Sequence, residues 1–332
     1  MSAEMPNPDR PARLAFVGAS DWMQRYHLAA AARLRETGAL EIRGIWNRTG
    51  EKAARLSDRF AIPRVYETLD ELKHDRTLDG VVVVVSRTSV FEVLMSLAEC
   101  RLPILTEKPP GDTPEQAERL AETFGERGVV GFNRRFVPLH DRFRELIGAS
   151  GLPHLAECRF ARRGRRDPRF VTESGVHAIN LLEWLLGPIA SLDARCGPDA
   201  ASSSAPPLHR RALARFAGGA EAFICFLPRA GYACEHYTVH ASDRTLTLEC
   251  AAHYTDESES RIVVREHRGG AEPAVSVITE QERDPLERGG FMGEYREFLE
   301  LIRTGRPPRS SFRSSVSSVR LSHCVEHGGR LP

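Results

Sequence analysis

Short apolar runs alternate with longer amphipathic segments through the first 133 residues of the chain. The apolar runs have the length of buried strands, and one of them, Val81 to Val85, consists of five valines, which is typical of a strand buried on both faces. The segments between these runs have the periodicity of helices. Strands that alternate with helices at this spacing predict a doubly wound parallel sheet, with strands at 13–17, 40–46, 80–85, 102–106 and 129–132 and helices at 25–36, 51–60, 69–73, 90–100 and 114–126.

The hydrophobic pattern changes after Asn133. Two helices and one strand are expected next, at 137–147, 175–186 and 155–160. Between residues 189 and 278 the chain alternates β-branched and aromatic residues with polar ones, and no helical segment separates the expected strands. Consecutive strands without crossover helices predict an antiparallel sheet, with strands that include 220–227, 235–241, 245–250 and 261–266. Helices at 294–303 and 314–327 close the chain.

These patterns predict a two-domain protein of the α/β plus α+β class. Residues 1–12 are polar and rich in proline, and we expect them to form a disordered leader. Residues 13–133 form a Rossmann domain with the doubly wound parallel sheet. Residues 134–332 form a second domain that combines an open antiparallel sheet with the C-terminal helices. A length of 332 residues supports this division, because a single core rarely grows so large.

Composition narrows the functional classes. Hydrophobic residues make up 41% of the chain and charged residues 27%, which is ordinary for a soluble globular protein. A net charge of +1 argues against nucleic-acid or membrane binding driven by bulk charge, and no apolar run approaches the roughly 20 residues that span a bilayer. The seven cysteines are scattered, without a C-x-x-C pair, so we expect reduced thiols, no metal site and a cytoplasmic protein.

Lys108 is the central residue of the predicted site. It follows the expected strand at 102–106, and open α/β folds bind their ligands at the carboxyl ends of parallel strands. Pro109 restricts its own backbone and that of Lys108, so the amine is held in place. Farther along the chain, Glu173 and His177 have the spacing that places two side chains on one face of a helix. We expect these three ionisable groups to converge at one site.

Several motifs, taken together, resemble the Gfo/Idh/MocA family of NAD(P)-dependent oxidoreductases. They are Glu107-Lys108-Pro109, then Gly131-Phe132-Asn133-Arg134-Arg135-Phe136-Val137-Pro138, then Gly175-Val176-His177 leading into Trp184-Leu185-Leu186-Gly187. The resemblance covers almost the whole chain. It implies a dinucleotide-binding Rossmann domain and an open antiparallel sheet, with substrate between that sheet and the nicotinamide. It further implies a sugar, cyclitol or sugar nucleotide as substrate, and a homo-oligomer, a dimer or a tetramer, that associates through the open sheet face.

The predicted phosphate loop departs from the glycine pattern of a dinucleotide-binding turn. In place of G-x-G-x-x-G/A the chain has Gly18-Ala19-Ser20-Asp21-Trp22-Met23, and all of these except Ala19 are candidate cofactor-binding residues. Gly18 keeps the tight turn, and the Ser20 hydroxyl is able to donate to a phosphate oxygen. Asp21 is unfavourable beside a phosphate unless its carboxylate caps the helix, and Met23 replaces a small residue. The alternative is an ordinary strand-to-helix turn in a domain that binds no dinucleotide.

The residues after the second expected strand bear on the choice of cofactor. An acidic residue there would accept a hydrogen bond from a ribose 2′-hydroxyl, but this chain has Asn47-Arg48-Thr49. The Arg48 guanidinium suits a 2′-phosphate, and no carboxylate adjoins it, so NADP(H) is favoured over NAD(H). The alternative is that Arg48 is a solvated turn residue. The other candidate cofactor-binding residues are Asn47, Ser86, Arg87, Glu107 and Lys108.

The predicted catalytic residues are Lys108, Glu173 and His177. Lys108 would transfer a proton to or from the reacting oxygen, Glu173 would orient the ammonium, and His177 would hold the oxygen or relay the proton. The resemblance implies an aspartate where Glu173 stands and, in many relatives, another where Asn180 stands. Asn180 would still hydrogen-bond a substrate hydroxyl, but it is not a base. The structural alternatives are a surface ion pair for Lys108, a helix cap for Glu173 and a core position for His177.

Two arginine features have more than one interpretation. Arg135 would contact the substrate, together with Lys108, His177 and Asn180, or else pair with Glu107. A run of arginines before the helix at 175–186 would clamp an anionic substrate or form a solvated or subunit-contacting loop; it consists of Arg159, Arg162, Arg163, Arg165, Arg166 and Arg169.

These predictions favour an NADP(H)-dependent oxidoreductase that transfers hydride to or from a sugar, cyclitol or sugar-nucleotide carbonyl or hydroxyl, with reduction as the favoured direction. Two other functions fit the same residues. A catalytically silent sugar-sensing regulator would be consistent with the altered glycine loop and Asn180. A non-redox hydrolase that oxidises its substrate transiently would need the same lysine.

Overall fold

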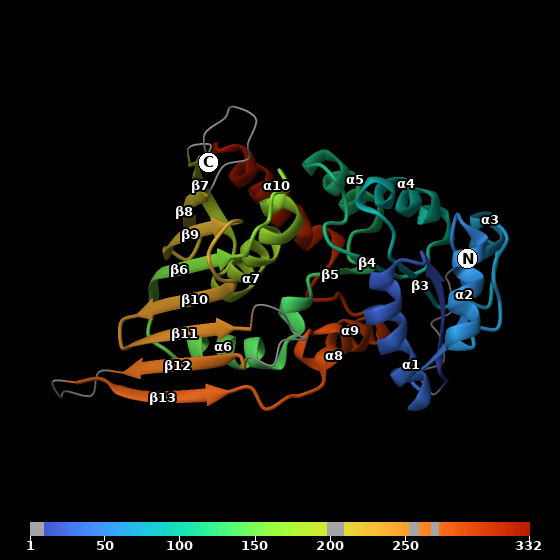
Figure 1. The fold of residues 1–332 in the computed structure, drawn as a ribbon, viewed down its shortest axis with the longest axis horizontal. Helices are drawn as coiled ribbons and strands as arrows, with labels where there is room; N and C mark the ends of the chain where they lie inside the picture. The colour runs from blue at the N-terminus through green and yellow to red at the C-terminus, as the bar shows by residue number, and fades with distance from the viewer. Residues whose placement is uncertain (1–9, 198–208, 252–258, 267–271) are drawn as a thin grey trace. The chain divides into compact units, whose positions relative to one another are not determined.

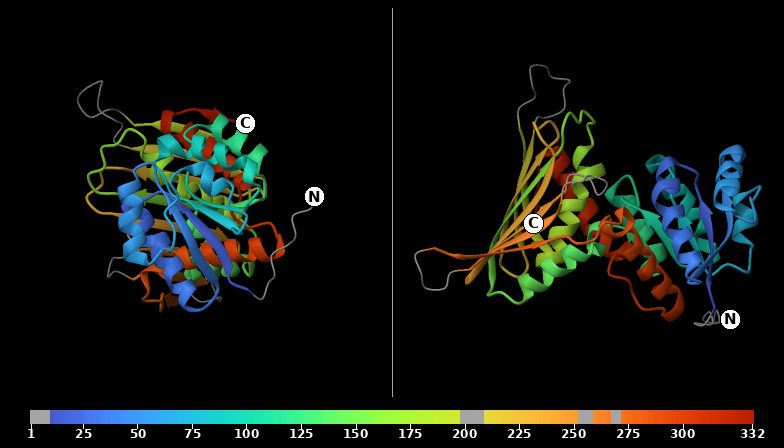
Figure 2. Two further views of the ribbon diagram at one scale, coloured as in Figure 1. Left: turned by 90° about the vertical axis from the view of Figure 1, so that its right-hand side faces the viewer. Right: turned by 60° about the horizontal axis from the view of Figure 1, so that its bottom comes forward.

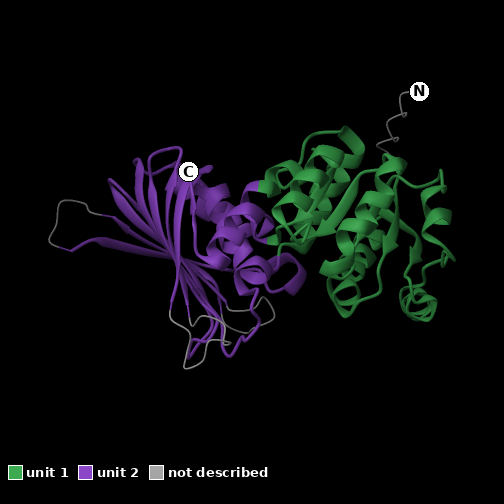
Figure 3. Ribbon diagram, turned by 90° about the horizontal axis from the view of Figure 1, so that it is seen from above, with its two compact units in different colours: residues 1–133, 290–316 green, residues 134–289, 317–332 purple. Residues whose placement is uncertain are grey.

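The computed structural model describes residues 10–197, 209–251, 259–266 and 272–332 (Figure 1; two further views in Figure 2). The chain divides into two compact units, which have separate colours in Figure 3. The first, here called the Rossmann unit, comprises residues 1–133 and 290–316, and the second, called the sheet unit, comprises residues 134–289 and 317–332. The sequence pattern assigned all of 134–332 to one domain, whereas the structure groups residues 290–316 with the Rossmann unit. Most of the expected leader, residues 1–9, lies outside the described residues.

The Rossmann unit is built on a five-stranded sheet in which all neighbouring strands are parallel. The strand order β2-β1-β3-β4-β5 confirms the predicted doubly wound topology, because β1 has β2 on one side and β3 on the other. The strands are β1 (Ala12–Val17), β2 (Leu40–Trp46), β3 (Gly80–Val83), β4 (Ile104–Glu107) and β5 (Gly128–Gly131). The helices are η1 (Met23–Leu28), α1 (Ala29–Glu36), α2 (Gly50–Phe60), α3 (Leu69–Lys73), α4 (Arg87–Leu97), η2 (Ala98–Cys100), α5 (Pro114–Phe124) and α9 (Phe291–Thr304).

Two details of this sheet differ from the sequence-based expectation. The valine strand ends at Val83, and α4 already begins at Arg87, so Ser86 to Ser89 form the start of a helix. Helix α9 packs on the parallel sheet although it comes from the far end of the chain. A Cβ on Gly80 would lie 2.8 Å from the ring of Phe298 and 2.9 Å from Ile302, so β3 and α9 are in close contact. Packing, rather than position along the chain, therefore assigns α9 to the Rossmann unit.

The sheet unit contains a nine-stranded sheet with the order β13-β12-β11-β10-β6-β9-β8-β7-β14. Neighbouring strands are antiparallel except for the central pair β6 and β9, which are parallel. The predicted antiparallel sheet is confirmed as a whole but is wrong for this pair, because the helical segment after β6 carries the chain back before β7 begins. The strands are β6 (Pro153–Ala161), β7 (Ile189–Cys196), β8 (Arg210–Phe216), β9 (Glu221–Leu227), β10 (Cys234–Ala241), β11 (Arg244–Cys250), β12 (Arg261–Glu266), β13 (Ala274–Thr279) and β14 (Arg330–Leu331).

Helices cover one face of the nine-stranded sheet, and none of the described helices covers the other face, here called the open face (Figure 2). Helix α6 packs against β11 and β12, and α7 packs against β6. Strand β8 displays the resulting alternation, since Ala212 and Ala214 are buried while Leu213 between them is exposed. The remaining helical segments are η3 (Asn133–Phe136), α6 (Pro138–Gly148), η4 (Val171–Gly175), α7 (Val176–Leu186), α8 (Pro285–Arg288) and α10 (Phe312–His327).

Candidate functional site

A groove of about 240 Å³ crosses the carboxyl ends of three neighbouring strands in the Rossmann unit. Gly18 follows β1, residues 46–49 lie at the end of β2, and residues 84–86 follow β3. Gly18 has a φ of +113°, and a Cβ there would lie 2.0 Å from the carbonyl oxygen of Val84. Only glycine allows the turn to pass so close to the β3 end. The groove lies where the strand order reverses direction, which is where open α/β sheets bind their ligands.

The loop after Gly18 is arranged differently from the sequence-based expectation. Ser20 lines the groove, and its hydroxyl accepts a hydrogen bond from the Met23 backbone N–H at 3.1 Å. Ser20 therefore caps the helical segment, and Asp21 instead forms an exposed ion pair with Arg25 at 2.9 Å. Met23 is fully buried. The bulk of Met23 thus fills the interior of the unit and does not line the groove.

Two cationic residues lie at the β2 end of the groove. Arg48 is exposed, and no ion pair to it is formed by the residues that the structure describes. Lys52, in the first turn of α2, lines the same groove and was missed in the sequence. Asn47 shapes the turn between them, since its side-chain amide donates to the Thr49 carbonyl at 2.9 Å. A guanidinium and an ammonium at one end of a groove suit a phosphate group.

A compositional signal would have identified Lys52. The chain contains 46 lysine and arginine residues, and the lysines among them are only Lys52, Lys73 and Lys108. Arginine does not lose its proton in proteins, whereas lysine does, so a lysine in so arginine-rich a chain draws attention to its position. Lys73 pairs with Asp70 at 2.7 Å on the surface. The other two lie where strands of the parallel sheet end.

Glu107 anchors the segment that carries Lys108. Its Oε1 accepts a hydrogen bond from Trp22 Nε1 at 2.7 Å and lies 2.9 Å from Nε2 of the fully buried His27. Its Oε2 accepts from the backbone N–H of Lys108 at 3.2 Å. Burial alone would raise the pKa of Glu107, but His27, Lys108 and Trp22 hold that pKa below its usual value. Trp22 and Glu107, both predicted to bind cofactor, are thus engaged with one another.

The sequence pattern did not single out His27, and the local helix geometry explains why. Trp22 and His27 are five residues apart, and an α-helical period of 3.6 does not place such residues together. The segment η1 is π-helical, with a wider turn that brings residues at this spacing closer to one face. Both rings therefore reach the same carboxylate oxygen on β4.

Arg87 belongs to a fixed ion pair beside the Lys108 segment. Its Nη1 lies 2.5 Å from Oδ1 of Asp112, and the two side chains are about equally exposed, at 23% and 22%. Ser86, which lines the groove, donates its hydroxyl to Ser89 at 3.0 Å. The Lys108–Pro109 peptide bond is cis, and Lys108 is partly exposed. Arg87 therefore links the start of α4 to the chain that follows Lys108.

Glu173 and His177 lie in the sheet unit on one continuous helical segment, η4 followed by α7. This segment begins at Val171, earlier than predicted, so Glu173 lies within it. Its amino end is capped by Glu326, whose carboxylate accepts from the backbone N–H groups of Val171 at 2.6 Å and Thr172 at 3.1 Å. Glu173 is a candidate cap of this helix by its sequence position, but Glu326 caps it instead. Glu173 is partly exposed and His177 is 8% exposed.

Asn180 and Arg135 form part of a buried polar network in the sheet unit. Asn180 Oδ1 accepts from Arg135 Nε at 2.6 Å, and Asn180 Nδ2 donates to Ser318 at 2.9 Å. Ser318 in turn donates to Glu183 at 2.6 Å. Burial raises the pKa of Glu183 despite hydrogen bonds from two serines. Both ends of the Asn180 amide are thus occupied, which argues against the predicted contact with a substrate hydroxyl and assigns Asn180 to holding Arg135.

The arginine run does not act as one cluster. Arg162 pairs with the buried Glu235 and also donates to the backbone carbonyl of Ala161. Arg165 pairs with Asp167 at 2.8 Å, and Arg159 donates to the Tyr232 hydroxyl at 3.2 Å. At least these three guanidinium groups have partners within the sheet unit, which weakens the prediction of a shared clamp for an anion.

The structure therefore places the predicted residues in two sets. The Rossmann unit carries the groove residues and Lys108, and the sheet unit carries Glu173, His177, Arg135 and Asn180. The convergence of Lys108 with Glu173 and His177 stays a prediction. Within the described ranges, no three His, Cys, Asp or Glu side chains are grouped as a metal ion would require. Every helix in the same ranges is too short or too polar to cross a lipid bilayer.

Comparison with known proteins identifies the first part of the chain. Residues 12–134 match the NAD-binding Rossmann fold of the GFO_IDH_MocA oxidoreductase family. Through this region the chain is similar to the Gfo/Idh/MocA family. The resemblance found in the sequence is thereby confirmed. The match covers the whole parallel sheet, from β1 to β5, and ends where the sheet unit begins.

Curated relatives match about half of the chain. YceM of Salmonella typhimurium is 28% identical over 187 residues, which are 55% of this chain and 59% of that protein. The rhizopine catabolism protein MocA of Rhizobium meliloti is 30% identical over 188 residues, 53% of this chain and 57% of that protein. An inositol 2-dehydrogenase of Leifsonia xyli is 29% identical over 158 residues, 43% and 46% of the two chains. The chain thus spans about half the length of the curated relatives that it matches.

Solved structures share the fold over nearly the full length. A levoglucosan dehydrogenase in complex with NADH and levoglucosan has a TM-score of 0.80 at 16% identity, covering 97% of this chain and 99% of that one. The 3-ketoreductase KijD10 of Actinomadura kijaniata, in complex with NADP and TDP-benzene, has a TM-score of 0.77 at 19% identity, covering 96% and 98%. Identities this low establish the common architecture of a Rossmann part followed by a mostly antiparallel sheet.

Proposed function

We propose that this protein is an NADP(H)-dependent oxidoreductase that transfers hydride to or from a carbonyl or hydroxyl carbon of a sugar, cyclitol or sugar nucleotide, with reduction as the favoured direction. The observation that carries the proposal is the groove across β1, β2 and β3, with Arg48 and Lys52 at one end. Lys108, whose backbone N–H donates to its neighbour Glu107, follows the next strand of the same sheet. The proposed dinucleotide site and the proposed proton donor therefore belong to one edge of the same sheet.

The groove residues fit a dinucleotide. Gly18 lets the turn after β1 pack directly against the Val84 carbonyl, which is the tight-turn role of the first glycine in a dinucleotide-binding turn. Ser20 offers a hydroxyl on the same side. Arg48 and Lys52 would bind the 2′-phosphate, which favours NADP(H) over NAD(H). When bound, the nicotinamide would supply or accept the hydride, and the protein would supply the proton.

The chain's own groups account for the proton transfer. Lys108 would act as both proton donor and proton acceptor. An arginine would not serve in this role, because a lysine ammonium is able to lose its proton and a guanidinium is not. Glu173 would orient that ammonium and His177 would hold the reacting oxygen. Arg135, fixed by Asn180, would position the substrate. Support for a sugar-like substrate comes from the names of similar proteins, which are a levoglucosan dehydrogenase, an inositol 2-dehydrogenase and a rhizopine catabolism protein.

Titration with NADPH and NADP⁺ tests the cofactor assignment. Trp46 lines the groove, so its fluorescence should be quenched when either nucleotide binds. Absorbance loss of NADPH with a panel of ketosugars and inosose compounds then tests the reaction. Quenching followed by steady NADPH consumption is the expected result. Absence of binding would instead favour a sensor, and product without net cofactor turnover would favour a hydrolase.

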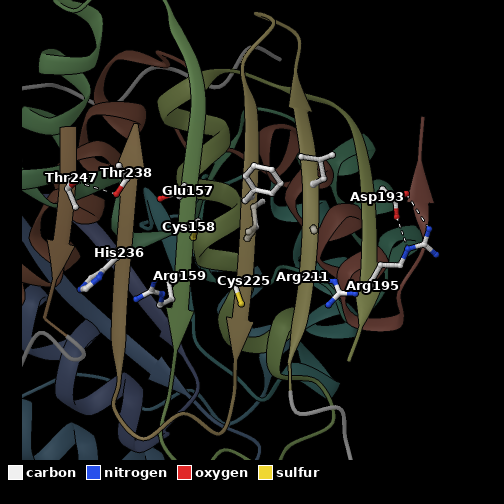
Figure 4. A pocket seen from close by; sticks show the side chains of 14 residues that line it. Glu157, Cys158, Arg159, Asp193, Arg195, Arg211, Cys225, His236, Thr238 and Thr247 are labelled. Carbon is white, nitrogen blue, oxygen red and sulfur yellow. Dashed lines mark hydrogen bonds and ion pairs between the residues drawn. The ribbon is translucent and has the colours of Figure 1, made fainter. Parts of the chain in front are cut away.

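We also propose that a second copy of the chain covers the open face of the sheet unit. Leu213 on β8 and Phe223 on β9 are direct cross-strand partners, and they are 41% and 55% exposed. They line a hollow of about 560 Å³ (Figure 4). Charges of both signs border it, among them Arg211 and Asp193, so two copies of one face are able to complement each other. Exposed apolar pairs of this kind mark interaction surfaces.

Sedimentation analysis of Phe223→Asp tests this association. The wild type should be a dimer or a tetramer, and the variant should shift to a smaller species, because a carboxylate would be desolvated in the interface. Leu152→Asp is the matched control, since Leu152 is 73% exposed but lies outside the hollow. A monomeric wild type, or an equal mass for the wild type and Phe223→Asp, would contradict the proposal.

A further inference from the structure

Glu294 is a buried acid next to the Lys108 segment that no step of the proposed reaction uses. It lies on α9, has no exposed surface and reaches the point where β4 and β5 end. Gly131 on β5 pairs with Glu107 on β4. A Cβ placed on Gly131 would lie 3.4 Å from Glu294 Oε1 and 3.5 Å from the Cα of Glu107. The carboxyl group of Glu294 thus lies against Gly131, where β4 and β5 end.

This carboxyl group is in an environment that opposes its ionisation. Neither of its oxygens has a hydrogen-bond partner among the described residues. A buried carboxylate without partners is costly, so the group retains its proton instead. Burial raises the pKa of Glu294 well above its usual value, and the charge of Glu107 raises it further, while Lys108 acts in the opposite direction.

The titratable groups around Glu294 come from three elements. Glu107 and Lys108 belong to β4 and the residue after it, and His27 on η1 contacts Glu107 at 2.9 Å. Tyr295 is the neighbour of Glu294 on α9, and burial raises the pKa of its hydroxyl. Glu107 is already held by donors from His27, Trp22 and the Lys108 backbone, so it keeps its charge. Glu294 is therefore the acid of this group whose charge is able to change.

We propose that Glu294 is a positioning residue for Lys108, whose carboxyl group beneath the Glu107–Lys108 segment links its own proton to the proton on the Lys108 amine. The linkage is reciprocal, as for any two coupled binding events. An ionised Glu294 favours the ammonium form of Lys108, and a charged Lys108 makes Glu294 easier to ionise. The catalytic consequence rests on the proposed function, because it matters only if Lys108 transfers a proton.

The small number of lysines makes this linkage measurable without substrate or cofactor. Reductive methylation with ¹³C-formaldehyde would label Lys52, Lys73 and Lys108, together with the amino terminus, and single Lys→Arg variants would assign the signals. Titration by NMR then gives the pKa of Lys108 in the wild type and in Glu294→Gln. The variant should lower the Lys108 pKa by at least about 0.5 unit, because a lysine titrates at about pH 10, where the proposal has Glu294 ionised although it is protonated at neutral pH, and Gln supplies no charge that favours the ammonium.

A matched control separates this effect from the general loss of a carboxylate on α9. Glu300→Gln removes a carboxylate from the same helix, where Glu300 is 42% exposed beside Arg306, and should leave the Lys108 titration unchanged. Equal Lys108 titrations in the wild type and Glu294→Gln would overturn the proposal. If Glu294→Gln does not fold, Glu294→Asp withdraws the carboxyl from Gly131 by one methylene and should still lower the Lys108 pKa; an unchanged titration would again overturn it.

The outcome is separable from that of the proposed function. A shifted Lys108 titration in a protein that binds no nucleotide would support the linkage and refute the oxidoreductase. In an active enzyme, the pH profile of kcat for Glu294→Gln should move in the same direction as the Lys108 titration, with the nucleotide Kd unchanged. A purely structural role for Glu294 would alter stability but would move neither the Lys108 titration nor the pH profile.

Discussion

Glu235 in the sheet unit and Glu294 in the Rossmann unit are both buried, but their surroundings shift their pKa values in opposite directions. In the sheet unit, Glu235 on β10 is flanked by the guanidinium groups of Arg134, at 2.5 Å, and Arg162. Burial alone would raise its pKa, but the two arginines lower it to about 2. In the Rossmann unit, Glu294 has no hydrogen-bond partner among the described residues, and its pKa is raised. One carboxyl group is charged and satisfied, and the other is uncharged and unsatisfied.

Glu235 therefore belongs to a structural ion cluster, whereas Glu294 is a buried group whose environment costs stability. The Glu235 cluster joins β10, the end of β6 and the segment before α6, and its carboxylate is paired with two guanidinium groups. Glu294 is buried without hydrogen-bond partners among the described residues, an arrangement that costs stability, where the chain ends β4 and begins the Lys108 segment. Unsatisfied buried groups of this kind tend to occur at functional sites, because selection for stability alone would remove them. The predictions below test this contrast.

The largest effect is expected from breaking the compensated cluster. Glu235→Gln would leave two guanidinium groups without their carboxylate and should destabilise the sheet unit by about 3–5 kcal/mol. Hydrogen exchange of β6 and β10 amides would measure the loss. Glu249→Gln, which removes a more exposed carboxylate beside Arg261, should cost less than about 1 kcal/mol.

The pH dependence of the Glu235 effect has a definite sign. Because the folded-state pKa is lowered to about 2, the stabilisation is fully present above the unfolded-state pKa of about 4.3. It is lost as the pH falls from there toward 2. The difference between wild type and Glu235→Gln should shrink over this interval, and a difference independent of pH would contradict the assignment.

The second prediction concerns the amine in the Rossmann unit. Lys108→Ala should lower turnover by about 100-fold or more while leaving the affinity for cofactor nearly intact, because proton transfer is lost but the groove is not altered. Steady-state kinetics and nucleotide titration measure the two quantities separately. Lys73→Ala is the matched control, since Lys73 pairs with Asp70 away from the groove. An unchanged turnover in Lys108→Ala would remove the residue from the mechanism.

The third prediction concerns the cations of the groove. Arg48→Ala should weaken NADPH binding by about 1–3 kcal/mol and NADH binding much less, because only NADPH presents a 2′-phosphate. Lys52→Ala should also weaken NADPH binding more than NADH binding, but by a smaller free energy than Arg48→Ala, since an ammonium makes no bidentate contact with a phosphate. Isothermal titration with both nucleotides measures the ratio. Equal losses for NADPH and NADH would show that the 2′-phosphate binds elsewhere.

The smallest effect is expected at Glu294, and its sign is the reverse of that at Glu235. A raised folded-state pKa means that the group costs stability above its unfolded-state pKa of about 4.3, increasingly so as the pH rises toward the folded-state value. Glu294→Gln, a neutral isostere, should therefore raise the thermal midpoint at pH 8 by about 2–4 °C, and the gain should vanish near pH 4. A loss of stability at pH 8 would show that Glu294 is charged and satisfied.

Local patterns predicted most of the elements but not their partners. Strand β1 and helix α3 follow directly from short-range periodicity, and Gly187 ends α7 as expected. The parallel pairing of β6 with β9 was missed, because strand direction depends on where the chain crosses over and not on the residues in the strands. Helix α9 was assigned to the wrong part of the chain for a related reason, since its partner Gly80 lies far away in the sequence.

The candidate site divides in the same manner. Gly18, Arg48 and Lys108 were identified from residue type and position after a strand, because parallel strands of one sheet present their carboxyl ends at one edge. His27 and Glu294 were not identified. The residues next to His27 and Glu294 in the sequence do not indicate that these side chains contact the segment around Glu107 in the folded protein.

By itself, the sequence determined the doubly wound sheet, the resemblance to a family and the candidate groups for binding a phosphate or moving a proton, since periodicity and glycine placement act over short distances. Only the tertiary structure decided which buried charges are compensated. Ionisation of an acid depends on the few ångströms around its oxygens, and those atoms are supplied by segments distant along the chain. Glu235 and Glu294 are chemically the same residue, and packing alone made one an ionised partner of two arginines and the other a neutral acid beside Lys108.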